Sequence, residues 1–215
     1  MATLYGVYRS RATRIFWLAA ELGLRLTHVP VLQASKLSDP LAEGAPLNTR
    51  SPKFLKVSPL GAIPVLEDDG FILTESLTIN LYLARKYGGG LAAQTGQEDA
   101  LMQQWAMFGL ASLEPHTLPL FYAAGKGSDE GLGIAPHLAA LTQPLQDLNR
   151  HLGTTGFMVG DRFTVADINM AEIVRYAQFR PGLVEGYPAI NDWIRTCQAR
   201  PGFKAMWAAR EAETE

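Results

Sequence analysis

Patterns typical of β-strands are confined to the first third of this 215-residue chain. Short apolar runs that fit strands occur at residues 2–6, 27–32, 63–66 and 71–73, whereas the chain from residue 97 onward shows only helical periodicity. A chain divided in this way packs helices against a sheet in its first part and against one another in its second. The sequence therefore predicts an α/β domain followed by an all-helical domain.

The first part of the chain alternates between strand and helix in the order β-α-β-α-β-β-α. An amphipathic helix over about 12–22 joins the first two strands, so those strands should run parallel. The polar stretch 33–53 is interpreted as loops with a short irregular helix. Asp-Asp-Gly at 68–70 is typical of a hairpin turn and adds an antiparallel edge, and a last helix follows over about 75–87.

A stretch rich in Gly, Ala and Gln at residues 88–97 separates the two patterns and is typical of a linker. We therefore expect one domain over residues 1–87 and an all-helical domain over residues 98–215. Within the second, Thr164-Val-Ala-Asp167 has the form of a helix capping box, which we interpret as a folding signal.

Composition and charge exclude several functional classes. With 47% hydrophobic residues, 19% charged residues and a net charge of −2, the chain lacks the dense basic stripe of a nucleic-acid-binding protein. It has no apolar run long enough to span a membrane, and its first residues show no secretion signal. Its single cysteine, Cys197, fits a reducing compartment and is interpreted as a small buried hydrophobe. We expect a cytoplasmic protein that binds neither membranes nor nucleic acids.

The charge is unevenly distributed along the chain. Residues 1–88 hold ten Lys/Arg against seven Asp/Glu, a net +3, and residues 89–215 hold nine against fourteen, a net −5. A mildly basic first part suits a small anionic ligand.

The turn after the first strand places hydroxyl groups and arginines beside a helix N-terminus. Tyr5, Tyr8 and Ser10 lie within six residues of one another, and Arg9 and Arg11 flank the serine. Such a position lowers the pKa of a thiol that is brought to it. Solvated turn residues with a serine cap would give the same pattern, so both interpretations stay open.

Two further features are unusual for their positions. Pro64 opens a strand although it cannot donate to a ladder, which fits either an edge strand or a cis bond that presents the backbone of Ile63 to a ligand. Glu75 and Ser76 open a helix, where free N–H groups and the serine hydroxyl can bind a carboxylate while Glu75 accepts from an ammonium group. The alternative for the second feature is a self-contained helix cap.

In this order and spacing, the motifs resemble the cytosolic glutathione transferase family over essentially the whole chain. VSPLGAIPVLEDDGFILTESLTINLYLARKYG at 57–88 looks like the family's glutathione-binding half, and GDRFTVADINMAEI at 160–173 looks like the capping motif of its helical domain. The turn after the first strand is similar to that of bacterial members of the serine type. The resemblance implies a thioredoxin-like α/β domain over 1–87 and an all-α domain over 98–215 that completes a hydrophobic substrate site.

The resemblance also implies roles for individual residues. Ser10 stands where serine-type members hydrogen-bond the glutathione thiolate, and Tyr5 stands where tyrosine-type members do so; of the two we expect Ser10. The chain departs from the pattern at Ala62, where many members carry Gln or Lys. The residues implied to bind glutathione are Ile63 through its backbone, a cis Pro64, Glu75 and Ser76 for the γ-glutamyl group, and Arg50 or Lys53 for the glycyl carboxylate.

The implied activity is transfer of the thiol of glutathione, a co-substrate, to small hydrophobic electrophiles in detoxification, by a homodimer that needs no metal. A non-catalytic binding or interaction protein of the same fold and a glutathione-dependent reductase or peroxidase are the alternatives. The lining expected for the electrophile site is Tyr8, Trp105, Phe108, Ala111 and Ser112.

Overall fold

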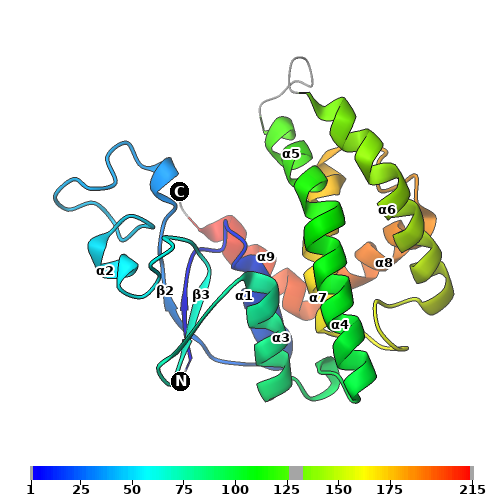
Figure 1. Ribbon diagram of the computed structural model, residues 1–215, viewed down its shortest axis with the longest axis horizontal. Helices are drawn as coiled ribbons and strands as arrows, with labels where there is room; N and C mark the ends of the chain where they lie inside the picture. Colours follow the sequence, from blue (N-terminus) through cyan, green and yellow to red (C-terminus); the bar gives the residue numbers. More distant parts are fainter. Residues whose placement is uncertain (1, 126–132, 214–215) are drawn as a thin grey trace. The chain divides into compact units, whose positions relative to one another are not determined.

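The computed structural model describes residues 2–125 and 133–213, which form two compact units. The first unit comprises Met1–Tyr87 together with Pro201–Glu215, and the second comprises Gly88–Arg200 (Figure 1). The chain's last helix, which falls within the range expected for the helical domain, thus belongs to the unit that contains the sheet.

The first unit is built on a four-stranded sheet with the order β2-β1-β3-β4. As predicted, β1 (Thr3–Tyr5) runs parallel to β2 (Thr27–Val29), and the hairpin of β3 (Val65–Asp68) and β4 (Phe71–Thr74) adds the antiparallel edge. β3 pairs directly with β1, so the segment that enters β3 lies beside the end of β1. The helical segments of this unit are α1 (Thr13–Leu22), η1 (Ala34–Lys36), α2 (Pro52–Leu55), α3 (Ser76–Tyr87) and α9 (Pro201–Ala212).

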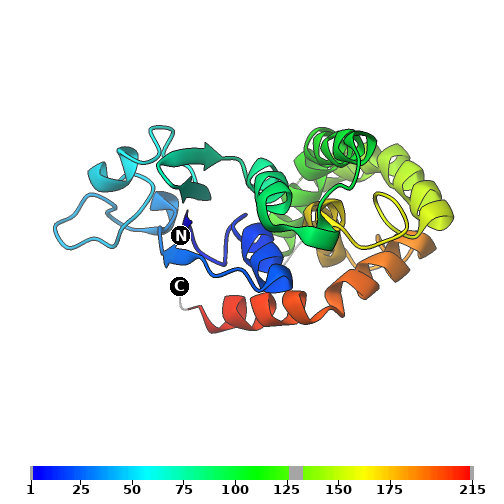
Figure 2. The same ribbon diagram turned by 90° about the horizontal axis from the view of Figure 1, so that it is seen from below.

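Helices α1 and α9 pack closely through an aromatic contact. Trp17 is fully buried, and its ring meets Phe203 edge-on with ring centroids 4.9 Å apart. Gly202 allows the approach, because a Cβ built there would lie 2.6 Å from the Glu21 side chain. The two helices run side by side in both views (Figures 1 and 2).

The second unit is a helical bundle around α7 (Val165–Val174), whose ten residues are all buried. Gly109 lets the turn between α4 (Gly96–Phe108) and α5 (Glu114–Ala124) approach α7, because a Cβ there would lie 2.7 Å from Ile173 Cδ1. That turn is a π-helix, so the helical backbone continues from α4 into α5. The other helical segments are η2 (Gly89–Leu91), α4 (Gly96–Phe108), η3 (Gly109–Leu113), α5 (Glu114–Ala124), α6 (Ile134–Thr155), η4 (Arg175–Phe179) and α8 (Pro188–Gln198).

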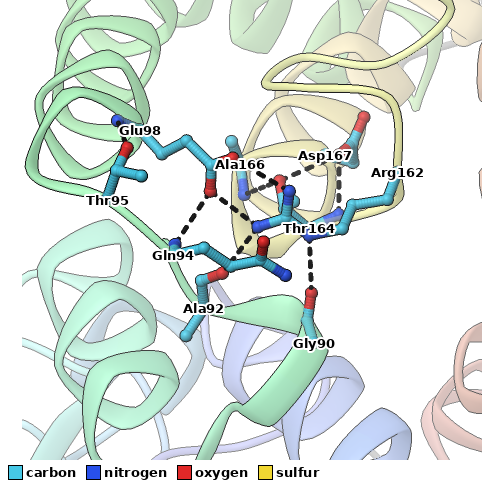
Figure 3. A network of polar contacts seen from close by, with 9 residues as sticks. All are labelled: Gly90, Ala92, Gln94, Thr95, Glu98, Arg162, Thr164, Ala166 and Asp167. Atoms are coloured by element: carbon cyan, nitrogen blue, oxygen red, sulfur yellow. Dashed lines mark hydrogen bonds and ion pairs between the residues drawn. The ribbon is translucent and has the colours of Figure 1, made fainter.

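The predicted capping box is present at the start of α7. Asp167 Oδ2 accepts from the backbone N–H of Thr164 at 2.8 Å, and Thr164 Oγ1 accepts from Ala166 N–H at 3.3 Å (Figure 3). The other oxygen of Asp167 accepts from Met158 N–H and Trp193 Nε1–H, both at 2.9 Å. Burial raises the pKa of Asp167, although these donors oppose the shift. The Asp167 carboxylate thus connects the loop at Met158, the start of α7 and Trp193 of α8.

Arg162 forms a second network in the same unit. Its guanidinium donates to both carboxylate oxygens of Glu98, at 3.0 and 2.6 Å, and to the carbonyl oxygens of Gly90 and Ala92 (Figure 3). The hydrogen bonds that Glu98 itself accepts, from Arg162 and from the N–H of Gln94, lower its pKa to about 2. The pair fixes the segment after α3 to the beginning of α4.

We predict that Asp167→Ala lowers the free energy of unfolding by about 3 kcal/mol or more, because it leaves several buried donors without their acceptor. Asp192→Ala, an exposed position on α8, should change it by less than about 0.5 kcal/mol. Urea denaturation followed by circular dichroism measures both. Equal stability of the two variants would contradict a structural role for the capping carboxylate.

The Glu98–Arg162 pair should make stability depend on acid pH. Because the folded-state pKa of Glu98 lies below its usual 4.5, the pair stabilises the fold above that pH and loses its contribution as the pH falls towards 2. The difference in thermal midpoint between the wild type and Glu98→Gln should therefore be largest near neutral pH and narrow below pH 4.5. Glu185→Gln, at an exposed site, should show no such trend. A difference that stays constant with pH would contradict the assignment.

Candidate active site

The turn after β1 and the segment before β3 meet at Gly6. A Cβ built on Gly6 would lie 3.2 Å from Ala12 Cβ and 3.7 Å from Pro64 Cα, and its φ of +151° favours glycine. The Ile63–Pro64 peptide bond is cis, as predicted. Gly6 therefore lies against both the start of α1 and the cis-proline segment.

Ser10 lies in this turn, two residues before the N-cap of α1. Its hydroxyl donates to the carbonyl oxygen of Val7 at 2.7 Å and accepts from the N–H of Ala12 at 3.1 Å. The side chain is partly exposed. Ser10 thus closes the turn, and its hydroxyl proton reaches a ligand only by turning away from Val7.

Tyr5 directs its hydroxyl to β3. The hydroxyl donates to Glu67 Oε2 at 2.8 Å, and the ring packs against Phe54 with centroids 6.2 Å apart. Burial and, after it, the Glu67 carboxylate raise the pKa of Tyr5. The phenol of Tyr5 is therefore already engaged within the sheet.

Glu75 and Ser76 stand at the beginning of α3 in different environments. Glu75 has a φ of +67° and an exposed side chain. Ser76 is only 4% exposed, and its Oγ accepts from Arg14 Nη1 at 2.9 Å. A left-handed conformation at a residue other than glycine costs about 1 kcal/mol or more and is often found at binding sites.

Arg14 contacts two residues of α3, partners that our sequence analysis did not identify. It is 1% exposed on α1, and besides donating to Ser76 it accepts from Asn80 Nδ2 at its carbonyl oxygen. Position 14 stands four residues before the buried Leu18, so it falls on the face of α1 that the apolar stripe assigns to the core.

The two residues that we expect to bind the glycyl carboxylate of glutathione, Arg50 and Lys53, lie at the beginning of α2. Arg50 lines an open hollow of about 520 Å³ that reaches Gly61, two residues before Ile63. Lys53 is exposed on α2 and does not line that hollow. Of the two, only Arg50 thus shares a hollow with the segment that leads to the cis-proline bond.

The expected lining of the electrophile site is divided between the two units. Tyr8 belongs to the first unit and stacks on Phe16 with centroids 3.8 Å apart. In the second unit, Trp105 and Phe108 meet edge-on at 5.4 Å, and Ala111 and Ser112 lie in the π-helical turn η3. The assembly of these five residues into one site stays a prediction.

The sequence analysis also missed a cavity of about 300 Å³ beside the β1–α1 turn. Glu213, close to the C-terminus, contributes a carboxylate to its wall, and burial and this carboxylate raise the pKa of Tyr8. The lining residues are Val7, Arg9, Leu32, Gln33, Lys36, Leu37 and Glu213.

Over residues 2–125 and 133–213, no three or more His, Cys, Asp or Glu side chains gather in a way that could hold a metal ion. Within the same ranges, no helix is both long enough and apolar enough to cross a membrane. Cys197 is buried in α8, as expected.

A thioredoxin-like α/β unit joined to a helical unit is the fold of glutathione transferases. The N-terminal domain of the glutathione S-transferase family matches residues 4–90, and its C-terminal domain matches residues 135–201. The chain is 30% identical to glutathione S-transferase 3 of Zea mays, over 96% of this chain and 93% of that protein. This protein therefore belongs to the glutathione S-transferase family.

Two further similarities mark the breadth of the family. The chain resembles the structure of glutathione S-transferase III in its apo form with a TM-score of 0.80 and 28% identity, covering 100% of this chain and 99% of that one. It is also 32% identical to elongation factor 1-gamma of Carassius auratus, over 73% of this chain but only 36% of that protein.

We predict that Glu75→Gly raises the free energy of unfolding by about 1 kcal/mol, because glycine adopts the left-handed conformation without strain. Asp69→Gly is the matched control, since Asp69 has a φ of +53° in the β3–β4 turn, and it should be stabilising to a similar extent. Chemical denaturation measures both. A destabilised Glu75→Gly beside a stabilised Asp69→Gly would show that the Glu75 side chain supports the fold rather than a ligand.

Proposed function

We propose that this protein is a glutathione transferase that joins the thiol of glutathione to small apolar electrophiles. The observation that carries the proposal is the contact at Gly6, where the Ser10 turn meets the cis Ile63–Pro64 segment. A receptor for a thiol tripeptide needs a hydroxyl donor for sulfur and a peptide backbone for the ligand's own backbone, and these two segments supply both.

The residues of the first unit fit the three parts of glutathione. Among the residues that the structure describes, the peptide N–H and C=O of Ile63 pair with no other backbone group, so they are available to the cysteinyl part. Glu75 offers an exposed carboxylate for the γ-glutamyl ammonium group of glutathione. Ser76 accepts a hydrogen bond from Arg14, so its own hydroxyl proton is left to donate to the γ-glutamyl carboxylate of glutathione. Arg50, by its place on the hollow beside Gly61, is the better partner for the glycyl carboxylate.

Ser10 is the proposed partner of the sulfur. Thiols with an ordinary pKa of about 8.5 are only a few per cent ionised at neutral pH. A hydrogen bond to a charged group contributes about 1.5–3 kcal/mol, which corresponds to roughly one to two units of pKa. The thiolate then attacks an electrophilic carbon, a C–S bond forms, and the leaving group departs with the bonding electrons. No general base is needed for this step.

Tyr5 is the weaker candidate. Its phenol already donates to Glu67, and its raised pKa makes it a poorer hydrogen-bond donor. To serve the thiolate, Tyr5 would have to break that bond and leave the Glu67 carboxylate without it.

The remaining features of the proposal follow from the family. We propose a cytoplasmic homodimer active in detoxification, with the electrophile held by Tyr8 and by the second unit's Trp105, Phe108, Ala111 and Ser112. Glutathione is the co-substrate, and the reaction uses no metal.

A non-catalytic binding protein is the second candidate. The similarity to elongation factor 1-gamma favours it, as does Ala62, which offers no polar side chain where many transferases have one. Retention on immobilised glutathione together with turnover of 1-chloro-2,4-dinitrobenzene distinguishes the two. Retention without turnover would favour the binding protein.

We predict that Ser10→Ala raises the pKa of the bound glutathione thiol by roughly one to two units and lowers turnover near neutral pH about ten- to a hundredfold. Turnover should recover partly at alkaline pH, where the thiol ionises without help. Ultraviolet absorbance of the thiolate measures the pKa, and the aryl halide assay measures turnover.

Tyr5→Phe is the matched control and should have a much smaller effect on both quantities. Circular dichroism shows whether Ser10→Ala keeps its fold, since Ser10 also closes the turn. If Tyr5→Phe abolishes the thiolate absorbance while Ser10→Ala retains it, the assignment is reversed.

A further inference from the structure

Two histidine side chains face each other where α5 and α6 pack together in the second unit (Figure 1). His116 is the third residue of α5, and His137 is the fourth residue of α6. Their Nδ1 atoms lie 3.1 Å apart and their ring centroids 5.4 Å apart, so each ring points its Nδ1 edge at the other. Both residues are half-buried. Two imidazoles from different helices thus meet at one point.

This pair differs from the chain's two other histidines. The Nε2 atoms of His28 and His151 bond to backbone carbonyl oxygens, at 2.8 and 3.0 Å. In the part of the chain that the structure describes, the contact between the two Nδ1 atoms is the sole side-chain hydrogen bond of His116 and of His137. One ring donates its Nδ1–H, and the other accepts at an Nδ1 that carries no proton. A single shared proton therefore holds the pair together.

The distance between the two nitrogens also fits a shared metal ion. Imidazole nitrogens are ligands of zinc, copper and nickel, and two of them on a tetrahedral Zn²⁺ lie about 3.3 Å from each other. The observed distance of 3.1 Å is close to that value. A metal lies off the line that joins the nitrogens, so each ring has to tilt by about 35° to aim at it. The broad χ2 torsion of histidine gives the rings this freedom.

Metal binding rearranges a proton of the neutral pair and releases none. The ring that donates through Nδ1 changes to its other tautomer, with the proton on Nε2, and the accepting ring already carries its proton there. Both Nδ1 lone pairs are then free for the ion. The partial positive charge at the N-termini of α5 and α6 opposes a cation, but solvent and salt weaken it at half-buried side chains. It lowers the affinity without removing the site.

We propose that His116 and His137 bind one divalent ion of the zinc, nickel and copper group through their Nδ1 atoms. Two protein ligands leave further coordination positions for water, so we expect a Kd in the micromolar range rather than that of a four-ligand structural site. The ion links α5 to α6 within the second unit, whereas the residues proposed to bind glutathione belong to the first unit. It takes no part in the transfer reaction.

The test uses the full-length protein and zinc chloride, without glutathione, whose thiol itself binds zinc. Calorimetry should show one Zn²⁺ bound per chain of the wild type. His116→Gln and His137→Gln should each weaken this binding about tenfold or more, because even the loss of an outer-shell partner of a metal ligand costs about 10- to 100-fold. His151→Gln is the matched control, since it removes a histidine of the same unit outside the pair, and it should bind Zn²⁺ like the wild type.

Nitrogen-15 NMR of the histidine rings tests the wild type without any substitution. Zn²⁺ should shift the Nδ1 resonances of His116 and His137 and leave the Nε2 atoms of both rings protonated. The ring resonances of His28 and His151 should stay in place. Circular dichroism shows whether the variants keep their helices, and the NMR result stands even if one of them does not fold.

Three results would overturn the proposal. They are an absence of micromolar Zn²⁺ binding to the wild type, which would leave the pair as a proton-sharing contact between helices, an affinity that is unchanged in both His116→Gln and His137→Gln, and NMR shifts at His28 or His151 with none at the pair. Because neither glutathione nor an electrophile is present, a failure of the transferase proposal leaves this result intact.

Discussion

Gly6 follows β1 with a φ of +151°, at a place where a Cβ would lie 3.2 Å from Ala12 Cβ and 3.7 Å from Pro64 Cα. That approach sets the distance between the start of α1 and the segment that enters β3. The carbonyl oxygen of Gly6 also accepts from the ring nitrogen of His28 at 2.8 Å, which ties the same point to β2. Glycine at this position thus allows the start of α1 and the cis-proline segment to lie close together.

The parts of the fold that the sequence predicted correctly are those with local signals. The hairpin at 68–70 and the capping box at Thr164 each need only a few neighbouring residues, and the Gly/Ala/Gln stretch marks the end of the first pattern by composition. The cis bond before Pro64 was available through the resemblance of the surrounding motif, whereas the residues alone favoured an ordinary edge-strand proline.

The residues that the sequence did not reveal act across long separations. Arg14 meets Ser76 over 62 positions, and Glu213 meets Arg9 over 204. Neither pairing follows from periodicity, because a charged residue on a helix gives no sign of which distant hydroxyl or N–H it will reach. The engagement of Tyr5 with Glu67 is of the same kind, and nothing in the sequence indicated that this phenol would be bound within the sheet.

The placement of α9 on α1 bears on how the protein is made. The sheet and α1 leave the ribosome before the helix that covers Trp17, because all of Gly88–Arg200 lies between them in the chain. The face of α1 that holds Trp17 therefore stays uncovered by α9 until all of Gly88–Arg200 has been translated. That span is contiguous in sequence and can fold as soon as it emerges. The unit that contains the sheet is therefore begun before the helical unit but can be completed only after it, once Pro201–Ala212 has followed Gly88–Arg200 out of the ribosome.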